Sequence, residues 1–146
     1  MDIDYLPFHA NPKKPSFKPP LGAVDSHCHV FGPSDQFPYH PNRKYTPCDA
    51  PKAQLFSLRD FLGFSKNVIV QASCHGSDNS ALIGALQEAG NLARGVAVLS
   101  ANVSDKELFE MDQAGIRGIR FNFVKRLVDS TPKPVFATLA NRVKEL

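Results

Sequence analysis

Apolar positions along the chain follow two alternating patterns, short β-branched runs and longer stretches with helical spacing. The runs predict strands over residues 23–30, 67–73, 95–103 and 115–123. After each run, apolar residues recur every three or four positions, which predicts helices from residue 53, from about residue 79, after residue 104 and over 136–146. The chain therefore contains four strand–helix units in succession.

Local signals mark the ends of several predicted helices. Gly63 and Gly115 follow the last apolar positions of the first and third helices, where a glycine commonly ends a helix. Ser104 and Glu107 have the spacing of a capping box, in which each side chain bonds the other residue's backbone N–H. The third helix is therefore expected to begin at Ser104.

Four strand–helix units in a row predict an α/β fold with a parallel sheet and right-handed crossovers. A (β/α)8 TIM barrel takes about 250 residues, so four units in 146 residues match the N-terminal half of one. A small open doubly wound sheet is the alternative, although no glycine-rich phosphate loop favours it. We expect an extended arm over residues 1–22, which hold five prolines, and the half barrel over residues 23–146.

Composition narrows the class of protein. The net charge is +3, but the 17 Lys and Arg residues are scattered among 14 acidic ones, so nucleic acid is not an expected partner. No apolar run approaches the roughly 20 residues that span a bilayer, and the first residues do not read as a secretory signal. Three cysteines without a CxxC spacing predict reduced thiols. We expect a cytoplasmic protein without a membrane partner.

The stretch AVDSHCHVFG places two histidines, His27 and His29, at the end of the first predicted strand. Because side chains alternate along a strand, both imidazoles should point to one face together with Asp25, and Cys28 to the other. Paired imidazoles can bind zinc or a similar ion, polarise a carbonyl or carry protons. Hydrogen-bonded histidines at a strand end, without chemistry, remain the alternative.

The carboxyl ends of parallel strands meet at one edge of a sheet, so polar groups there should converge on one pocket. Arginine binds carboxylates through two parallel hydrogen bonds, which predicts an anionic substrate. Arg120 ranks above Arg117, because Arg120 shares its face with small or polar neighbours. The groups at this edge are His27 and His29 from the first strand, Ser73 and His75, which share a parity with Gln71, from the second, and Arg120 and Asn122 from the fourth.

Four segments together, AVDSHCHVFGP, RKYTPCDAP, VIVQASCHGSDNSALIGAL and AGIRGIRFNFVKR, resemble the amidohydrolase superfamily and, within it, the 2-pyrone-4,6-dicarboxylate hydrolase family of lactonases. The resemblance implies a (β/α)8 barrel and hydrolysis of a carboxylate-bearing cyclic ester to an open-chain tricarboxylate, in the breakdown of lignin-derived aromatics. It implies that His27 and His29 are the catalytic HxH pair, which would polarise the ester carbonyl with or without a metal. It also implies that four further residues hold the substrate's carboxylates and carbonyl: Tyr45, Ser73, Arg120 and Arg126.

The family's further histidine after strand 5 and its aspartate at strand 8, the implied general base, have no counterpart in this sequence. We therefore expect the C-terminal half of the barrel to be required for activity. The resemblance implies no essential metal, the alternative being zinc or manganese at His27 and His29. Alternative functions are hydrolysis of another anionic lactone, such as a sulfomuconolactone or a sugar lactone, and a non-catalytic half barrel that binds dicarboxylates.

Overall fold

The computed structural model describes residue 2 and residues 5–124 and 132–144. Helices and strands alternate through these residues, in the order and close to the positions that the sequence predicts. The elements are β1 (Val24–Cys28), α1 (Lys52–Leu62), β2 (Lys66–Val70), the 3-10 helix η1 (Ser73–His75), α2 (Ser80–Ala89), the 3-10 helix η2 (Gly90–Leu92), β3 (Ala93–Ala97), α3 (Asp105–Gln113), β4 (Ile116–Ile119) and α4 (Lys133–Val143).

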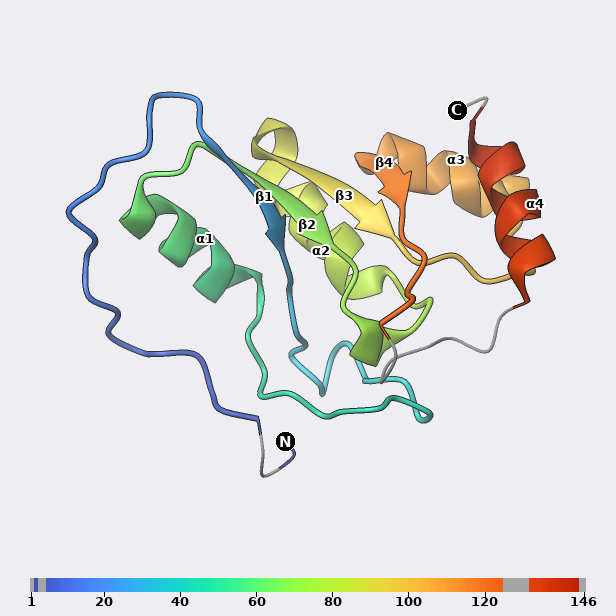
Figure 1. Ribbon diagram of the computed structural model, residues 1–146, viewed down its shortest axis with the longest axis horizontal. Coiled ribbons are helices and arrows are strands. Elements are labelled where there is room, and N and C mark those ends of the chain that lie inside the picture. Colours follow the sequence, from blue (N-terminus) through green and yellow to red (C-terminus); the bar gives the residue numbers. More distant parts are fainter. Residues whose placement is uncertain (1, 3–4, 125–131, 145–146) are drawn as a thin grey trace.

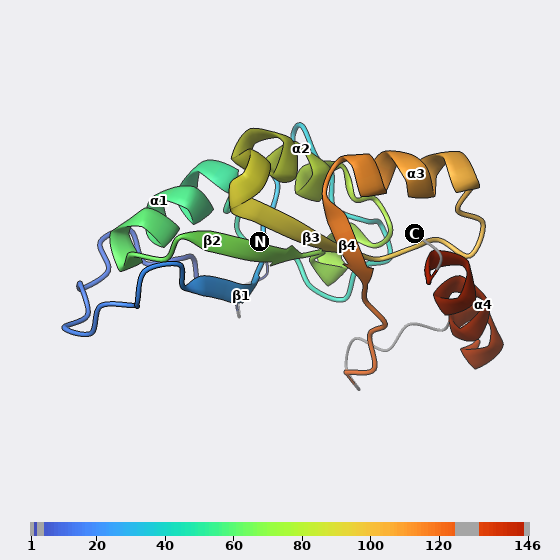
Figure 2. The same ribbon diagram turned by 90° about the horizontal axis from the view of Figure 1, so that it is seen from above.

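The four strands form one parallel sheet in the order β1-β2-β3-β4 (Figure 1). This order confirms the predicted α/β fold. Helices α1, α2 and α3 cover one face of the sheet, and α4 lies beside α3, beyond β4 (Figure 2). The opposite face carries no helix among the described residues (Figure 2).

The main core lies between α2 and the centre of the sheet. Leu82 and Leu86 of α2 pack against Ile69 of β2, and all three side chains are buried. Gly95 of β3 lets the helix approach, because a Cβ there would lie 2.7 Å from Leu86 Cδ1 and 2.6 Å from Ile116 Cδ1. Close packing of α2 thus fixes the positions of β2 and β3 relative to the helix, and β2 leads into the candidate site residue Ser73.

A second core joins α3 to α4 beyond the sheet edge, around the buried side chains of Leu108 and Leu139. The predicted capping box is confirmed: Ser104 Oγ accepts from the Glu107 backbone N–H at 3.2 Å, and Glu107 Oε2 accepts from the Ser104 backbone N–H at 2.7 Å. Gly63 ends α1, as predicted, and it adopts the left-handed conformation. In the described part of the chain, no helix has both the length and the apolar character to cross a membrane.

A bulge interrupts β1 between Asp25 and Cys28, at the first of the two histidines. Asp25 pairs with Asn67 and Cys28 pairs with Ile69, so three steps along β1 match two along β2. Asp25 and Cys28 consequently lie on the same face, and burial together with the neighbouring Asp25 charge raises the pKa of the Cys28 thiol to about 12. The prediction that Asp25 shares the face of the two histidines is therefore wrong, because strict alternation fails across a bulge.

The N-terminal arm contains no helix or strand among its described residues, and hydrogen bonds near both of its ends attach it to the fold. The Asp2 backbone N–H donates to the Thr46 carbonyl at 2.7 Å, and Asp2 Oδ2 accepts from the Thr46 backbone N–H at 2.6 Å. The Gly22 backbone N–H donates to Ser65 Oγ at 3.1 Å. Between these points the arm passes alongside α1 (Figure 1).

Candidate functional site

His27 and His29 lie side by side at the carboxyl end of β1. Their ring centroids are 5.0 Å apart, and the rings meet edge to face at 84°. His27 is exposed, whereas His29 is half-buried. The expected proximity of the two imidazoles therefore holds although β1 is bulged.

A hydrogen bond to the neighbouring strand fixes the protonation of His29. Nδ1 of His29 lies 2.7 Å from the Val70 carbonyl oxygen, which can only accept, so Nδ1 carries the proton. Burial, and to a lesser extent the nearby charges of His27 and Arg120, lower the pKa of His29. The ring is therefore neutral near pH 7 and presents the lone pair of Nε2, which can accept a hydrogen bond or bind a cation.

Two side chains from the end of β4 reach across β3 to the segment that follows β2. Arg120 Nη1 donates to the Gln71 carbonyl at 2.9 Å, and Asn122 Nδ2 donates to Ser73 Oγ at 2.9 Å. The two contacts run in parallel: the donors Arg120 and Asn122 are two residues apart in sequence, and so are their partners Gln71 and Ser73. Together with the bond from His29 to Val70, they attach side chains that follow β1 and β4 to one short segment of the chain, residues 70–73.

The predicted orientation of Arg120 agrees with its surroundings. Gly118, which pairs with Val96, lies on the sheet face away from α2, and Arg120 continues that face. Phe121 points the other way and packs against Phe136 of α4, with ring centroids 4.6 Å apart. Arg117, ranked lower, is exposed and pairs with Asp112 at 2.8 Å.

Tyr45 joins the same corner from the long loop after β1. Its ring is half-buried and stacks on Tyr5 of the arm, with centroids 4.9 Å apart and planes at 13°. Its hydroxyl lies beside Cys74, the residue after Ser73, and burial raises the pKa of Tyr45. The structure thus brings five of the predicted site residues to one end of the sheet: His27, His29, Tyr45, Ser73 and Arg120. Arg126 lies outside the described residues.

The predicted common face of Gln71, Ser73 and His75 is wrong. The chain leaves β2 at Val70 and turns into η1, so strand alternation does not extend to these residues. The Gln71 side chain is buried and donates to the Gly76 and Asp78 carbonyls at 3.1 and 2.7 Å. Sequence reasoning also missed that the carbonyls of Val70 and Gln71 anchor the site, because backbone groups leave no signal in residue identity.

Metal binding has partial support from these residues. Nε2 of His29 has no hydrogen-bond partner among the described residues, and the carbonyl on Nδ1 orients the ring, as in many histidine-ligated sites; His27 supplies a second imidazole. Within residues 2, 5–124 and 132–144, no group of three or more His, Cys, Asp or Glu side chains gathers to hold an ion. The pair thus fits two of the three protein ligands that catalytic zinc requires.

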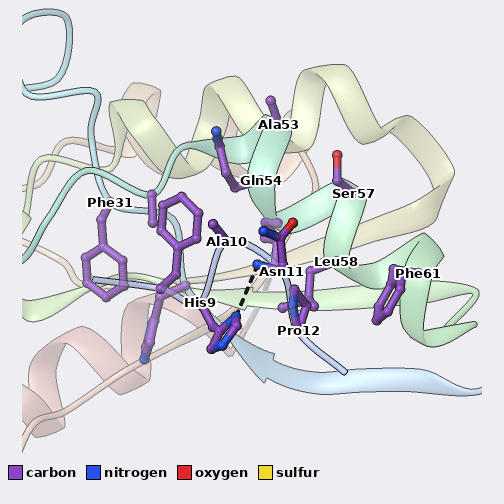
Figure 3. Close-up of a pocket in the computed structure, with 14 residues that line it drawn as sticks. His9, Ala10, Asn11, Pro12, Phe31, Ala53, Gln54, Ser57, Leu58 and Phe61 are labelled. Carbon is purple, nitrogen blue, oxygen red and sulfur yellow. Dashed lines mark hydrogen bonds between the residues drawn. The ribbon is translucent and has the colours of Figure 1, made fainter. Parts of the chain in front are cut away.

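A cavity of about 680 Å³ opens beside His29, between the arm and α1. Figure 3 shows its walls, where His9 to Pro12 of the arm face Leu58 and Phe61 of α1. His29 and Phe31 line it, whereas Ser73 and Arg120 do not. His29 therefore stands between this largely apolar cavity and the polar corner around Arg120.

Comparison with known proteins places this arrangement in a family. Residues 24–146 match the family model described as Amidohydrolase. The chain is 58% identical over 142 residues to a 2-pyrone-4,6-dicarboxylate hydrolase of Comamonas testosteroni, covering 97% of this chain and 47% of that protein. It is 39% identical over 108 residues to a 4-sulfomuconolactone hydrolase of Rhizobium radiobacter, covering 74% of this chain and 36% of that protein.

A solved structure has the same fold. The crystal structure of a probable 2-pyrone-4,6-dicarboxylic acid hydrolase from Acinetobacter baumannii, with citric acid bound, superposes with a TM-score of 0.73 at 26% identity, covering 86% of this chain and 46% of that one. The chain thus spans about half the length of the first of these relatives. Since the family model matches residues 24–146, from the first strand onward, the chain belongs to the amidohydrolase family.

Proposed function

We propose that this chain forms the N-terminal half of a (β/α)8 lactone hydrolase that opens 2-pyrone-4,6-dicarboxylate to a tricarboxylate. The observation that carries the proposal is that side chains from β1 and β4, His29 and Arg120, bond to the adjoining Val70 and Gln71 carbonyls, next to Ser73. The similarity to a named 2-pyrone-4,6-dicarboxylate hydrolase supports the choice of substrate. A role in aromatic catabolism and a cytoplasmic location, which the three free cysteines suit, belong to the same proposal.

Anion recognition is the part of the reaction that this chain would supply most directly. The bond to Gln71 engages Nη1 of Arg120, while the planar fork of a guanidinium carries five N–H donors. The others can grip a carboxylate of the substrate, with Ser73 and Tyr45 adding hydroxyl contacts. Arg126 is assigned to the same role by resemblance. A substrate with two carboxylates suits such a group of donors, because charge-assisted bonds offset its desolvation.

In the proposed reaction, water attacks the ring ester carbonyl carbon and the ring C–O bond then breaks. The water oxygen becomes part of the new carboxylate, and the released enol oxygen takes up a proton. Neutral His29, with its bare Nε2, can accept a hydrogen bond from the attacking water, whereas polarising the carbonyl would need a protonated ring or a cation. The base that removes the water proton is assigned to the second half of the barrel.

A divalent ion, if one binds, would be held by His27 and His29 and would polarise the ester carbonyl as a Lewis acid. The described residues supply two ligands for such an ion. The two steps that we assign to this chain, anion binding and water orientation, do not require it. The hydrogen bonds of Arg120 to the Gln71 carbonyl and of His29 to the Val70 carbonyl support these two roles, because they orient the side chains that would bind the anion and the water.

A second candidate substrate is 4-sulfomuconolactone, because the chain also resembles a hydrolase named for that lactone. A sulfonate is tetrahedral and a carboxylate is planar, so the two anions present different oxygen positions to the same arginine. A binding module without turnover is the alternative from another class of protein.

The test joins residues 1–146 to the second half of the Comamonas testosteroni hydrolase and compares this chimera with the 146-residue chain. Ring opening is followed by loss of the pyrone absorbance. We expect turnover of 2-pyrone-4,6-dicarboxylate by the chimera and none by the chain alone. A folded chimera that hydrolyses only 4-sulfomuconolactone would shift the assignment to that substrate. Binding of dicarboxylates without turnover in either form would identify a binding module.

A further inference from the structure

Asn122 holds Ser73 by a hydrogen bond whose direction the structure fixes. The Val124 backbone N–H lies 3.2 Å from Asn122 Oδ1, and an N–H can only donate. The oxygen of the amide is thereby identified, so the atom that faces Ser73 Oγ at 2.9 Å is the nitrogen Nδ2. An amide Nδ2 can only donate hydrogen bonds, so Ser73 Oγ is the acceptor in this contact.

The consequence concerns the hydroxyl proton of Ser73. A serine hydroxyl has one proton to donate and two lone pairs to accept with. Because Asn122 occupies a lone pair, the proton is directed elsewhere. Ser73 is half-buried, and Arg120 is attached two residues earlier on the same segment, through Gln71. The Ser73 proton is therefore directed to another acceptor, on the same short segment to which Arg120 is attached.

We propose that Asn122 is a positioning residue that makes Ser73 a hydrogen-bond donor to a carboxylate oxygen of the substrate. This inference rests on the proposed function, since it concerns the same corner of the fold. Asn122 does not itself contact the substrate. Asn122 makes the Ser73 hydroxyl a donor toward the substrate, so an acceptor oxygen of the substrate is favoured at this position and a donor group is disfavoured.

A double-mutant cycle in the chimera tests the inference. In the wild-type background, Asn122→Ala should raise KM for 2-pyrone-4,6-dicarboxylate about threefold to tenfold, the worth of one hydrogen bond, with kcat within about twofold. In a Ser73→Ala background the same change should raise KM less than about twofold. An equal loss in both backgrounds would overturn the inference, because a merely structural residue acts whether or not the hydroxyl is present.

A second variant keeps the local fold. In Asn122→Asp one carboxylate oxygen still accepts from the Val124 N–H, while the other turns the Ser73 proton toward itself. We expect KM to rise more than in Asn122→Ala, whereas Asn141→Asp on the exposed surface of α4, with the same change in net charge, should leave KM unchanged. A KM for Asn122→Asp equal to that of the wild-type chimera would contradict the inference.

The two proposals can fail separately. An active wild-type chimera in which the cycle shows no coupling leaves the proposed function standing and removes Asn122 from it. A folded wild-type chimera that neither binds nor hydrolyses the dicarboxylate overturns the proposed function, and the inference with it.

Discussion

The backbone N–H of Gly32 donates a hydrogen bond to Nε2 of His75 at 3.2 Å. Both groups are buried, and the His75 ring packs on Tyr39 with centroids 4.8 Å apart. The bond connects the start of the long loop after β1 to η1, at a residue two positions after Ser73. His75 therefore has a structural role, in holding the segment that carries a candidate substrate contact.

His75 should make the fold sensitive to acid. Burial lowers the pKa of His75 from its ordinary 6.5, because the charged ring would lie in a poorly solvated site, and protonation of Nε2 would break the bond to Gly32. As pH falls below 6.5, the unfolded chain binds a proton that the folded chain does not, so the free energy of unfolding decreases with falling pH. Above that pH this contribution to the slope vanishes.

Urea denaturation of His75→Leu between pH 4.5 and 8 measures both effects. We expect a loss of about 1 to 3 kcal/mol at pH 7.5, since the Gly32 N–H stays buried without an acceptor, and a shallower decline toward pH 5. Burial also lowers the pKa of His29, so this residue should account for part of the pH dependence that remains in His75→Leu. His9→Gln, at an exposed position of the arm, serves as the control. An unchanged slope in His75→Leu would show that other groups titrate on unfolding.

Gly95→Ala should destabilise the fold although alanine suits a strand better than glycine. The new Cβ would lie 2.6 Å from Ile116 Cδ1 and 2.7 Å from Leu86 Cδ1, so both side chains must move within a packed core. Such overpacking costs about 1 to 3 kcal/mol. Gly84→Ala on α2 is the matched control, because its nearest atom would be 3.6 Å away and helix propensity predicts a gain of up to about 1 kcal/mol. Loss of stability in both variants would contradict this account.

Periodicity and capping signals predicted the architecture well because each depends on neighbours in sequence. The box of Ser104 and Glu107 involves two side chains on one helical turn, and the parallel order follows from the repeated strand–helix unit. The position of Arg120 on the face of Gly118 agrees with parity, since Arg120 directly follows the regular strand β4, which ends at Ile119. Alternation is a local rule, and it succeeds where the backbone is regular.

Two failures of the same rule have a common physical cause. Asp25 changes face because a bulge inserts one residue into β1, and His75 leaves the strand face because β2 ends at Val70. No glycine or proline lies within the bulge or directly at the end of β2. Both irregularities are set by tertiary pairing, so a single sequence carries no local trace of them. The role of Arg126 stays a prediction, outside the described residues.

From the neutral His29 ring and the available lone pair of its Nε2, we predict how activity depends on pH and on metals. Because burial lowers the pKa of His29, Nε2 should stay available near pH 7, and kcat/KM should fall only as pH drops well below 6.5. In the chimera, His29→Phe should lower kcat on the order of tenfold to a hundredfold, since the attacking water loses its acceptor. Dialysis against a chelator should leave activity within about twofold. Loss on chelation with recovery on adding zinc or manganese would instead establish a metal at His27 and His29.

Arg120 should discriminate charged from neutral lactones. Its guanidinium lies on the open sheet face, oriented by the Gln71 carbonyl at 2.9 Å and close enough to His29 to lower the pKa of that ring. A charge-assisted contact is worth about 1.5 to 3 kcal/mol, so Arg120→Met in the chimera should cost about 10- to 150-fold in kcat/KM for the dicarboxylate. Arg120→Lys should recover little, because an ammonium cannot form two parallel hydrogen bonds.

The controls separate recognition from folding. Arg117→Met removes a neighbouring arginine that pairs with Asp112 on the surface and should leave kcat/KM within about twofold. A neutral lactone should lose much less than the dicarboxylate in Arg120→Met, since no carboxylate is there to be held. Equal losses on both lactones would mean that Arg120 serves the fold through the Gln71 carbonyl. Recognition of the carboxylates would then pass to Arg126 or to the second half of the barrel.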